Sequence, residues 1–113
     1  MRLSKIRDIL EATVLWGEEE LDREVLSACG SDFMSDVLAN VKEQALLLTG
    51  LVNPQVVRTA DMMDMTCIVF VRGKVPDETI LKLAQDRSIV VMTSRRQMYD
   101  ACGLLYINGL AGE

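Results

Sequence analysis

The chain has 113 residues, half of them hydrophobic, which predicts one compact domain over residues 1–113 with no room for a second. Its formal net charge of −5 disfavours nucleic-acid binding, because a domain that binds nucleic acid is usually basic. No apolar run approaches the ~20 residues of a membrane span, and residues 1–8 lack the apolar core of a signal peptide. We therefore expect a cytoplasmic protein without a nucleic-acid or membrane partner.

The chain has three cysteines, Cys29, Cys67 and Cys102, and no histidine. A structural zinc site normally takes four Cys or His ligands, and a histidine general base is excluded. We expect buried, reduced, structural thiols, no metal and no cofactor. The alternative is a partial iron–sulfur site that a partner chain completes.

The N-terminal third predicts a helix and two short strands. Leu3, Ile6, Ile9 and Leu10 share one helical face, with Ser4 as N-cap. A strand is expected at residues 13–16, ending at Gly17, and another within residues 23–28, centred on Val25 and Leu26. If residues 17–22 form a hairpin-like turn, these strands pair antiparallel; the sequence leaves that open.

A second helix is expected after Gly30. Its apolar face would be formed by Phe33, Met34, Val37, Leu38 and Val41, at spacings of three and four. Ser31 or Asp32 would cap the free N–H groups of its first turn. An anion site at this helix start is the alternative, which the charge of Asp32 disfavours.

Three strand–turn–helix units follow, with strand starts about 21–22 residues apart, the room that a strand and a crossover helix need. The strands are near-continuous apolar runs at residues 46–50, 68–73 and 89–94, as in parallel sheets covered on both faces. Asn53-Pro54 and Pro76-Asp77 predict helix starts. The last helix is expected over about residues 97–107, stopped by Asn108-Gly109.

Parallel strands place their C-terminal ends at one edge, where α/β proteins bind ligands. Arg72 and Lys74 would neutralise an anion there, hydroxyl groups would donate hydrogen bonds, and glycines would permit close backbone approach. The predicted ligand-binding residues are Thr49, Gly50, Asn53, Arg72, Gly73, Lys74, Thr93, Ser94, Arg95 and Arg96. The alternative is that the cations are ordinary solvated charges, or that they contact Glu18–Glu20.

Catalytic motifs are absent from the sequence. No G-x-x-x-x-G-K-[ST] loop, G-x-G-x-x-G loop or serine nucleophile elbow occurs, and no Ser-His-Asp set is possible without histidine. Asp61, Asp64 and neighbouring acidic residues are interpreted as a solvated helix face rather than as a metal cluster. We therefore predict no catalytic residues.

The pattern resembles the DRTGG domain, an α/β module related to the N-terminal domain of HPr kinase/phosphatase. Residues 67–73, Pro76, residues 80–84 and residues 90–93 follow its strand, turn, helix and strand. Of the five name-giving residues only Gly73 remains, with Asn53-Pro54 in place of Asp-Arg and Val71-Arg72 in place of Thr-Gly. Arg96 and Gln97 replace the Asp and Thr that commonly follow the last strand.

Residues 28–32, 48–55 and 71–74 are similar to a stand-alone branch of that family, often encoded beside iron hydrogenase or other electron-transfer subunits. The resemblance implies an accessory or regulatory role in redox metabolism and a homodimer. It implies no kinase chemistry, which lies in a separate domain of HPr kinase.

Sequence and resemblance together predict a three-layer α/β/α sandwich of about five strands, largely parallel, with a βαβαβ core. The expected function is a non-catalytic regulatory module that binds a nucleotide-like or phosphorylated ligand, a partner protein, or both. A pure dimerisation or adaptor protein is the alternative, and a phosphoryl-handling enzyme ranks last.

Overall fold

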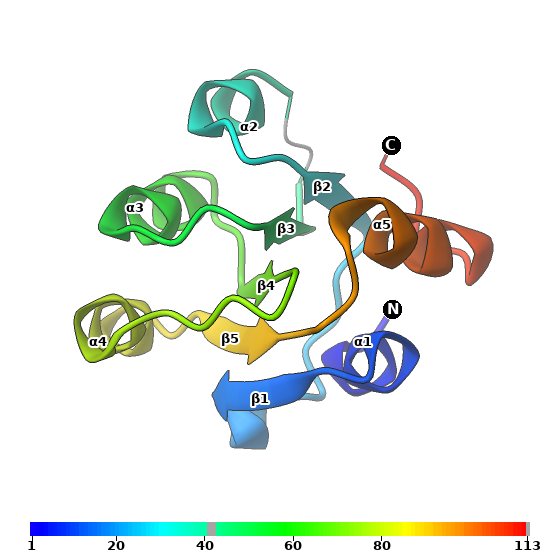
Figure 1. Cartoon of the computed structure of the whole chain (residues 1–113), viewed down its shortest axis with the longest axis horizontal. Helices are drawn as coiled ribbons and strands as arrows, with labels where there is room; N and C mark the ends of the chain where they lie inside the picture. The colour runs from blue at the N-terminus through cyan, green and yellow to red at the C-terminus, as the bar shows by residue number, and fades with distance from the viewer. Residues whose placement is uncertain (41–42, 113) are drawn as a thin grey trace.

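A computed structural model describes residues 1–40 and 43–112, which form one five-stranded sheet between two layers of helices (Figure 1). The helices are α1 (Leu3–Leu10), α2 (Met34–Asn40), α3 (Pro54–Met62), α4 (Glu78–Asp86) and α5 (Met98–Ile107), with a short 3-10 helix, η1, at Glu18–Glu20. The strands are β1 (Thr13–Trp16), β2 (Ser27–Gly30), β3 (Ala45–Thr49), β4 (Cys67–Phe70) and β5 (Val90–Thr93).

The strand order is β1-β5-β4-β3-β2. The last four strands in that order run parallel, and β1 alone pairs antiparallel, with β5. Helices α2, α3 and α4 cover one face of the sheet, and α1 and α5 cover the other (Figure 1). The three-layer α/β/α prediction, its largely parallel sheet and its three strand–turn–helix units are confirmed.

Burial on both faces explains why the central strands are apolar runs. All five residues of β3 and all four of β4 are buried, and their side chains alternate between the two hydrophobic cores. The caps of the following helices are local. Asn53 Oδ1 accepts a hydrogen bond from Gln55 N at 2.9 Å, and Asp77 Oδ1 accepts one from Ile80 N at 2.9 Å.

Two N-terminal predictions are wrong. Helix α1 starts at Leu3 with Arg2 as its N-cap, so Ser4 lies inside the first turn. The second strand is Ser27–Gly30 and not centred on Val25 and Leu26. Val25 instead exchanges backbone hydrogen bonds with Met1 beside an isolated bridge between Arg2 and Glu24.

The hairpin that the sequence left open does not form, because β1 and β2 lie at opposite edges of the sheet.

In the second helix, Met34 and Val37 are buried, whereas Phe33 and Leu38 are exposed. The prediction for Val41 lies outside the described residues. Within the described part of the chain, no helix is long and apolar enough to cross a membrane.

Candidate functional site

Loops that follow β3, β4 and β5 meet at the C-terminal edge of the sheet. Val71 N donates to Thr49 O at 2.9 Å, which joins the first two loops. Arg72 N donates to Arg96 O at 2.8 Å, and Gly73 N donates to Ser94 O at 2.8 Å. At this edge, seven of the ten predicted ligand-binding residues fall into two groups.

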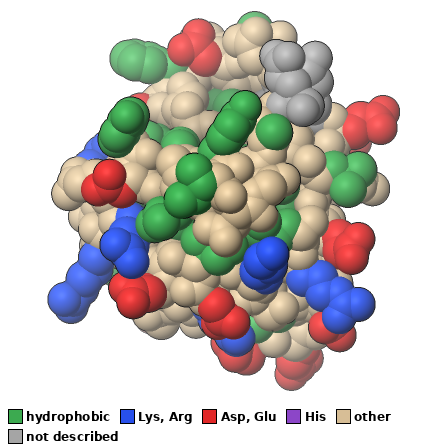
Figure 2. Space-filling model, turned by 90° about the vertical axis from the view of Figure 1, so that its right-hand side faces the viewer, with side chains coloured by type: hydrophobic (Ala, Val, Ile, Leu, Met, Phe, Trp, Pro, Cys, Tyr) green, Lys and Arg blue, Asp and Glu red, His purple; other side chains and the backbone are tan. Residues whose placement is uncertain are grey.

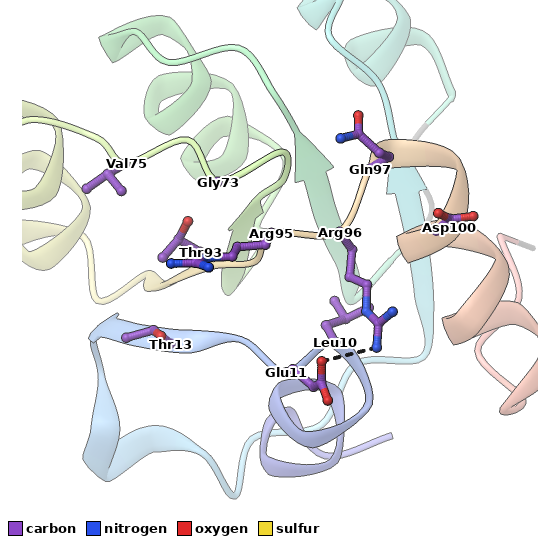
Figure 3. Close-up of a pocket in the computed structure, with 10 residues that line it drawn as sticks. All are labelled: Leu10, Glu11, Thr13, Gly73, Val75, Thr93, Arg95, Arg96, Gln97 and Asp100. Carbon is purple, nitrogen blue, oxygen red and sulfur yellow. Dashed lines mark hydrogen bonds and ion pairs between the residues drawn. The ribbon is translucent and has the colours of Figure 1, made fainter.

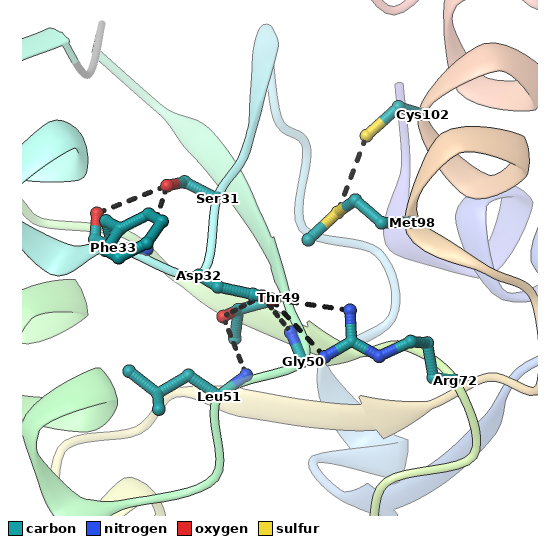
Figure 4. Close-up of polar contacts among 9 residues, drawn as sticks. All are labelled: Ser31, Asp32, Phe33, Thr49, Gly50, Leu51, Arg72, Met98 and Cys102. Carbon is teal, nitrogen blue, oxygen red and sulfur yellow. Dashed lines mark hydrogen bonds and ion pairs between the residues drawn. The ribbon is translucent and has the colours of Figure 1, made fainter.

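The first group is the Asp32 cluster, formed by Asp32, Thr49, Gly50 and Arg72 (Figure 4). Asp32 Oδ1 accepts from Gly50 N at 2.7 Å and from Thr49 Oγ1 at 3.3 Å. Both terminal nitrogens of Arg72 donate to Asp32 Oδ2 at 3.3 Å. The loops after β2, β3 and β4 are therefore tied together through one carboxylate.

Arg72 reaches Asp32 by lying over Gly50. Its backbone has φ +60°, and a Cβ on residue 50 would run into the guanidinium group. The N–H of Gly50 holds the pKa of the Asp32 carboxyl below its ordinary value, outweighing partial burial, with further help from Arg72 and Thr49. Arg72 is thus engaged by a carboxylate of its own chain. Of the two cap candidates that the sequence offered for the second helix, Asp32 is used in this cluster, whereas Ser31 Oγ accepts from Phe33 N at 3.0 Å, just before α2.

The second group lines a cavity of about 600 Å³ beside β5, which we call the strand-end cavity (Figure 3). Its lining residues come from α1, β1, the loop after β4, the end of β5 and the start of α5: Leu10, Glu11, Thr13, Gly73, Val75, Thr93, Arg95, Arg96, Gln97 and Asp100. Four of the ten predicted residues, Gly73, Thr93, Arg95 and Arg96, therefore share one cavity.

The two arginines of the strand-end cavity differ in their surroundings. Arg96 Nη2 lies 3.2 Å from Glu11 Oε2. Arg95 extends alongside Thr93 (Figure 3), is exposed, and forms no ion pair with any carboxylate in the described ranges. Gln97, the N-cap of α5, makes no capping bond with its side chain, so the first-turn N–H groups of α5 have no side-chain acceptor there.

The remaining predicted residues have structural roles or lie apart from the cavity. Ser94 is buried, and its hydroxyl donates to Leu10 O at 2.8 Å and accepts from Arg96 N at 3.2 Å. Thr93 Oγ1 donates to Lys74 O at 2.6 Å, which fixes the loop after β4. Lys74 is exposed, and Asn53 caps α3.

Sequence reasoning missed the contribution of the N-terminal segment to this edge. Leu10, Glu11 and Thr13 enter the strand-end cavity because β1 pairs with β5, which no local pattern indicates. The alternative contact between the strand-end cations and Glu18–Glu20 is wrong for two of the three glutamates. Glu18 pairs with Arg7 at 3.8 Å, and Glu20 pairs with Arg23 at 3.2 Å.

None of the three cysteines lines the strand-end cavity or belongs to the Asp32 cluster. Cys67 is buried, as predicted, but Cys29 and Cys102 are partly exposed. Burial raises the pKa of all three thiols, which disfavours their thiolate forms. Asp61, which the sequence placed on a solvated helix face, pairs with Arg87 at 3.1 Å. Within residues 1–40 and 43–112, no three His, Cys, Asp or Glu side chains converge as a metal site.

Comparison with known proteins identifies a family and a fold. The family model of the DRTGG domain matches residues 5–106. A solved structure of the CBS and DRTGG domains of the regulatory region of Clostridium perfringens pyrophosphatase, complexed with the activator diadenosine tetraphosphate, superposes with a TM-score of 0.76 at 20% identity. The match covers 92% of this chain and 45% of that chain, so the present chain spans less than half of its neighbour.

No curated protein matches the chain. At 20% identity the solved structure establishes a shared fold and carries no activity across. The family match extends over most of the chain, from within α1 to within α5, and agrees with the sheet and helices described above. The chain belongs to the DRTGG domain family.

Proposed function

We propose that this chain is a non-catalytic regulatory module that binds a small anionic, nucleotide-like ligand in the strand-end cavity. One observation carries the proposal. An exposed arginine without a carboxylate partner in the described residues, Arg95, borders a cavity of about 600 Å³ at the C-terminal edge of the parallel strands. That edge is the usual ligand position in open α/β sheets, and the cavity volume falls in the range of small-molecule sites, ~300–1,000 Å³.

Each wall of the cavity has a distinct role in this proposal. Arg95 would hold a phosphate or carboxylate with its planar guanidinium group. Gln97, which directly precedes α5, also lines the cavity, and the start of α5 adds a positive dipole that Asp100 of its first turn partly offsets. Gly73, at φ +69° with open space around its Cα, leaves room for a ligand to approach the backbone. Glu11, by pairing with Arg96, orients that second cation.

The family supports a regulatory role. The related pyrophosphatase region is regulatory and was solved with a dinucleotide activator, diadenosine tetraphosphate. Because that protein also contains CBS domains and is more than twice as long as the match, the dinucleotide is a first probe here and not an assigned ligand. Arg72, which the sequence placed in the site, is assigned to the Asp32 cluster instead, where Asp32 already neutralises its charge.

The proposal also covers the localisation, the oligomeric state and the partner of the protein. We infer a cytoplasmic homodimer that serves a hydrogenase or another electron-transfer enzyme, supported by the similarity of residues 28–32, 48–55 and 71–74 to the stand-alone branch of the family. A pure dimerisation or adaptor protein is the competing function, and it requires no ligand. An enzyme ranks last, since the chain has no histidine and its thiol pKa values are raised by burial.

A thermal-shift screen with nucleotides, dinucleotides and phosphorylated metabolites tests the proposal. A ligand at 100 times its Kd adds ~2.7 kcal/mol, which raises the Tm of a domain of this size by several degrees. The substitution Arg95→Ala should weaken binding at least tenfold, or ~1.4 kcal/mol. The matched control is Arg58→Ala, since Arg58 is an exposed arginine on α3, away from the cavity.

The outcomes separate the candidate functions. A hit that Arg95→Ala weakens and Arg58→Ala leaves unchanged supports the regulatory site. A flat screen, together with co-purification of a redox enzyme, supports the adaptor. A hit that Arg95→Ala does not affect contradicts the assignment of the strand-end cavity.

A further inference from the structure

Helix α5 is apolar on all sides. Ala101 and Leu105 are buried against the sheet, yet Tyr99, Tyr106 and Ile107 on the outer side are 88%, 67% and 78% exposed. Asp100 is the one charged residue of the helix. A helix that is hydrophobic all round is normally covered on every side, so the outer side of α5 lacks a covering partner within residues 1–40 and 43–112.

The exposed residues surround a groove of about 600 Å³ along the outer side of α5. In Figure 2, hydrophobic side chains gather over the upper half of this face, where α5 lies, and charged side chains gather over the lower half, where α1 lies. The groove is lined by Arg96, Tyr99, Asp100, Cys102, Gly103, Leu104, Tyr106 and Ile107.

Gly103 is the unusual residue in this groove. Glycine in the middle of a helix is destabilising relative to alanine. A Cβ at position 103 would meet no atom within 4 Å, so packing within the described chain does not require glycine there. Close approach of another helix backbone would require it.

We propose that the outer side of α5, which we call the α5 face (Tyr99, Gly103, Tyr106 and Ile107), is the docking surface for a second copy of this chain, with the two α5 helices crossing antiparallel at Gly103. The proposal deepens the homodimer inferred above by assigning its surface, and it needs no bound ligand.

The α5 face is self-complementary about Gly103. Tyr99 lies four residues before Gly103 and Tyr106 lies three after it, at a rise of ~1.5 Å per residue. An antiparallel crossing therefore brings Tyr99 of one copy level with Tyr106 of the other, and the twofold axis repeats that aromatic contact. Burying the exposed parts of Tyr99 and Tyr106 supplies ~300 Å² per copy, less than half of the ~800 Å² per partner in a standard interface, and the exposed Ile107 adds to that area.

The charged residues of the groove also favour a second copy of the chain in the antiparallel orientation. The groove has one arginine and one aspartate, so its net charge is zero and two copies would meet without net charge repulsion. Asp100 lies three residues from Gly103, so an antiparallel crossing keeps the two carboxylates ~9 Å apart along the axis, whereas a parallel crossing would bring them level. Arg96, before the start of α5, would approach the C-terminal end of the other helix, where the dipole favours a cation.

The groove adjoins the strand-end cavity, since Arg96 and Asp100 line both. A second copy on the α5 face would therefore sit at the wall of the proposed ligand site. This last step rests on the proposed function, whereas the dimer itself does not.

Sedimentation velocity of the full chain without ligand, over a range of micromolar concentrations, tests the proposal. We expect a dimer in the unmodified protein, and at least a tenfold increase in dimer Kd for Gly103→Gln and for Tyr106→Glu. Gln is the stronger helix former and Gly103 has open space, so the Gly103→Gln monomer should retain its helix content by circular dichroism. The control is Phe33→Glu, a change at an aromatic residue 69% exposed outside the α5 face, which should leave the dimer intact.

A chain that stays monomeric throughout the concentration range overturns the proposal, as does a dimer that both α5 variants preserve. A dimer lost equally in Phe33→Glu also overturns it. Because no ligand is present, these outcomes stand whether or not the strand-end cavity binds one.

Discussion

Replacing Asp32 by alanine removes the carboxylate that three neighbouring loops share. The hydroxyl of Thr49, which is fully buried, and the partly buried N–H of Gly50 would each lose an acceptor. Such a loss costs about 1–3 kcal/mol per group. The ion pair with Arg72 adds only about 0–1 kcal/mol, because the Asp32 side chain is 38% exposed to solvent. We expect Asp32→Ala to lower the free energy of unfolding by at least about 2 kcal/mol.

Urea denaturation measures this change as a lower midpoint at an unchanged slope. The matched control is Asp61→Ala, which removes an aspartate that also pairs with an arginine, Arg87, at 3.1 Å. Asp61 accepts no comparable bond from a buried donor in the described chain, so its loss should cost at most about 1 kcal/mol. Equal destabilisation by the two substitutions would refute the role given to the Asp32 cluster.

The same cluster predicts a pH dependence. The folded-state pKa of Asp32 lies below its ordinary value of 3.8, so the ionised carboxylate stabilises the fold above that value. This contribution is lost as the pH falls through the folded pKa and Asp32 becomes protonated. The stability difference between the unmodified chain and Asp32→Asn, which cannot ionise, should therefore narrow below pH 3.8. A constant difference from neutral to acid pH would contradict the electrostatic part of the argument.

Two further predictions concern buried groups. Ser94→Ala leaves the carbonyl of Leu10 without its hydroxyl donor in a buried position, so urea denaturation should show a loss of about 1–3 kcal/mol; unchanged stability would contradict the link between α1 and the loop after β5. In thiol labelling of the native protein, Cys29 and Cys102 should react slowly, because burial raises their pKa, and Cys67 only on unfolding. Equal rates for all three thiols would show that Cys67 is not protected.

The central units of the fold could be predicted from sequence because their signals are local. Strands buried on both faces appear as continuous apolar runs, and β3 and β4 are buried at every position. The caps Asn53 and Asp77 bind N–H groups two and three residues away, within reach of a sequence pattern. The regular spacing of strands and helices then indicated parallel crossovers.

The edges of the sheet could not be predicted in the same way. The position of β1 depends on pairing with β5, about 80 residues away in sequence, through a ladder that contains an irregularity. Val25 has the apolar character of a strand residue, but it is buried through its backbone pairing with Met1. Apolar character indicates that a residue is buried, but it does not indicate which part of the chain buries that residue.

In the candidate site, too, the local features could be predicted from sequence and the long-range contacts could not. Sequence pointed to the edge where the strands end, and Gly73, Thr93, Arg95 and Arg96 do line one cavity there. It could not show that Arg72 is engaged by Asp32, which lies 40 residues earlier in the chain. Asp32 resembled a helix cap because it precedes α2, but its acceptors are used by donors from other loops.

An amide-resolved NMR titration tests the central claim most directly. The probe is diadenosine tetraphosphate first, followed by any hit of the thermal-shift screen, added to the full chain and to Arg95→Ala. We predict saturable shifts at the amides of Gly73, Thr93, Arg95, Arg96 and Gln97, the residues that line the cavity at the strand ends, and their loss in Arg95→Ala. Saturable shifts confined to other parts of the chain, or no shifts with any of these compounds, would contradict the proposal that this DRTGG domain binds an anionic ligand at the strand-end cavity.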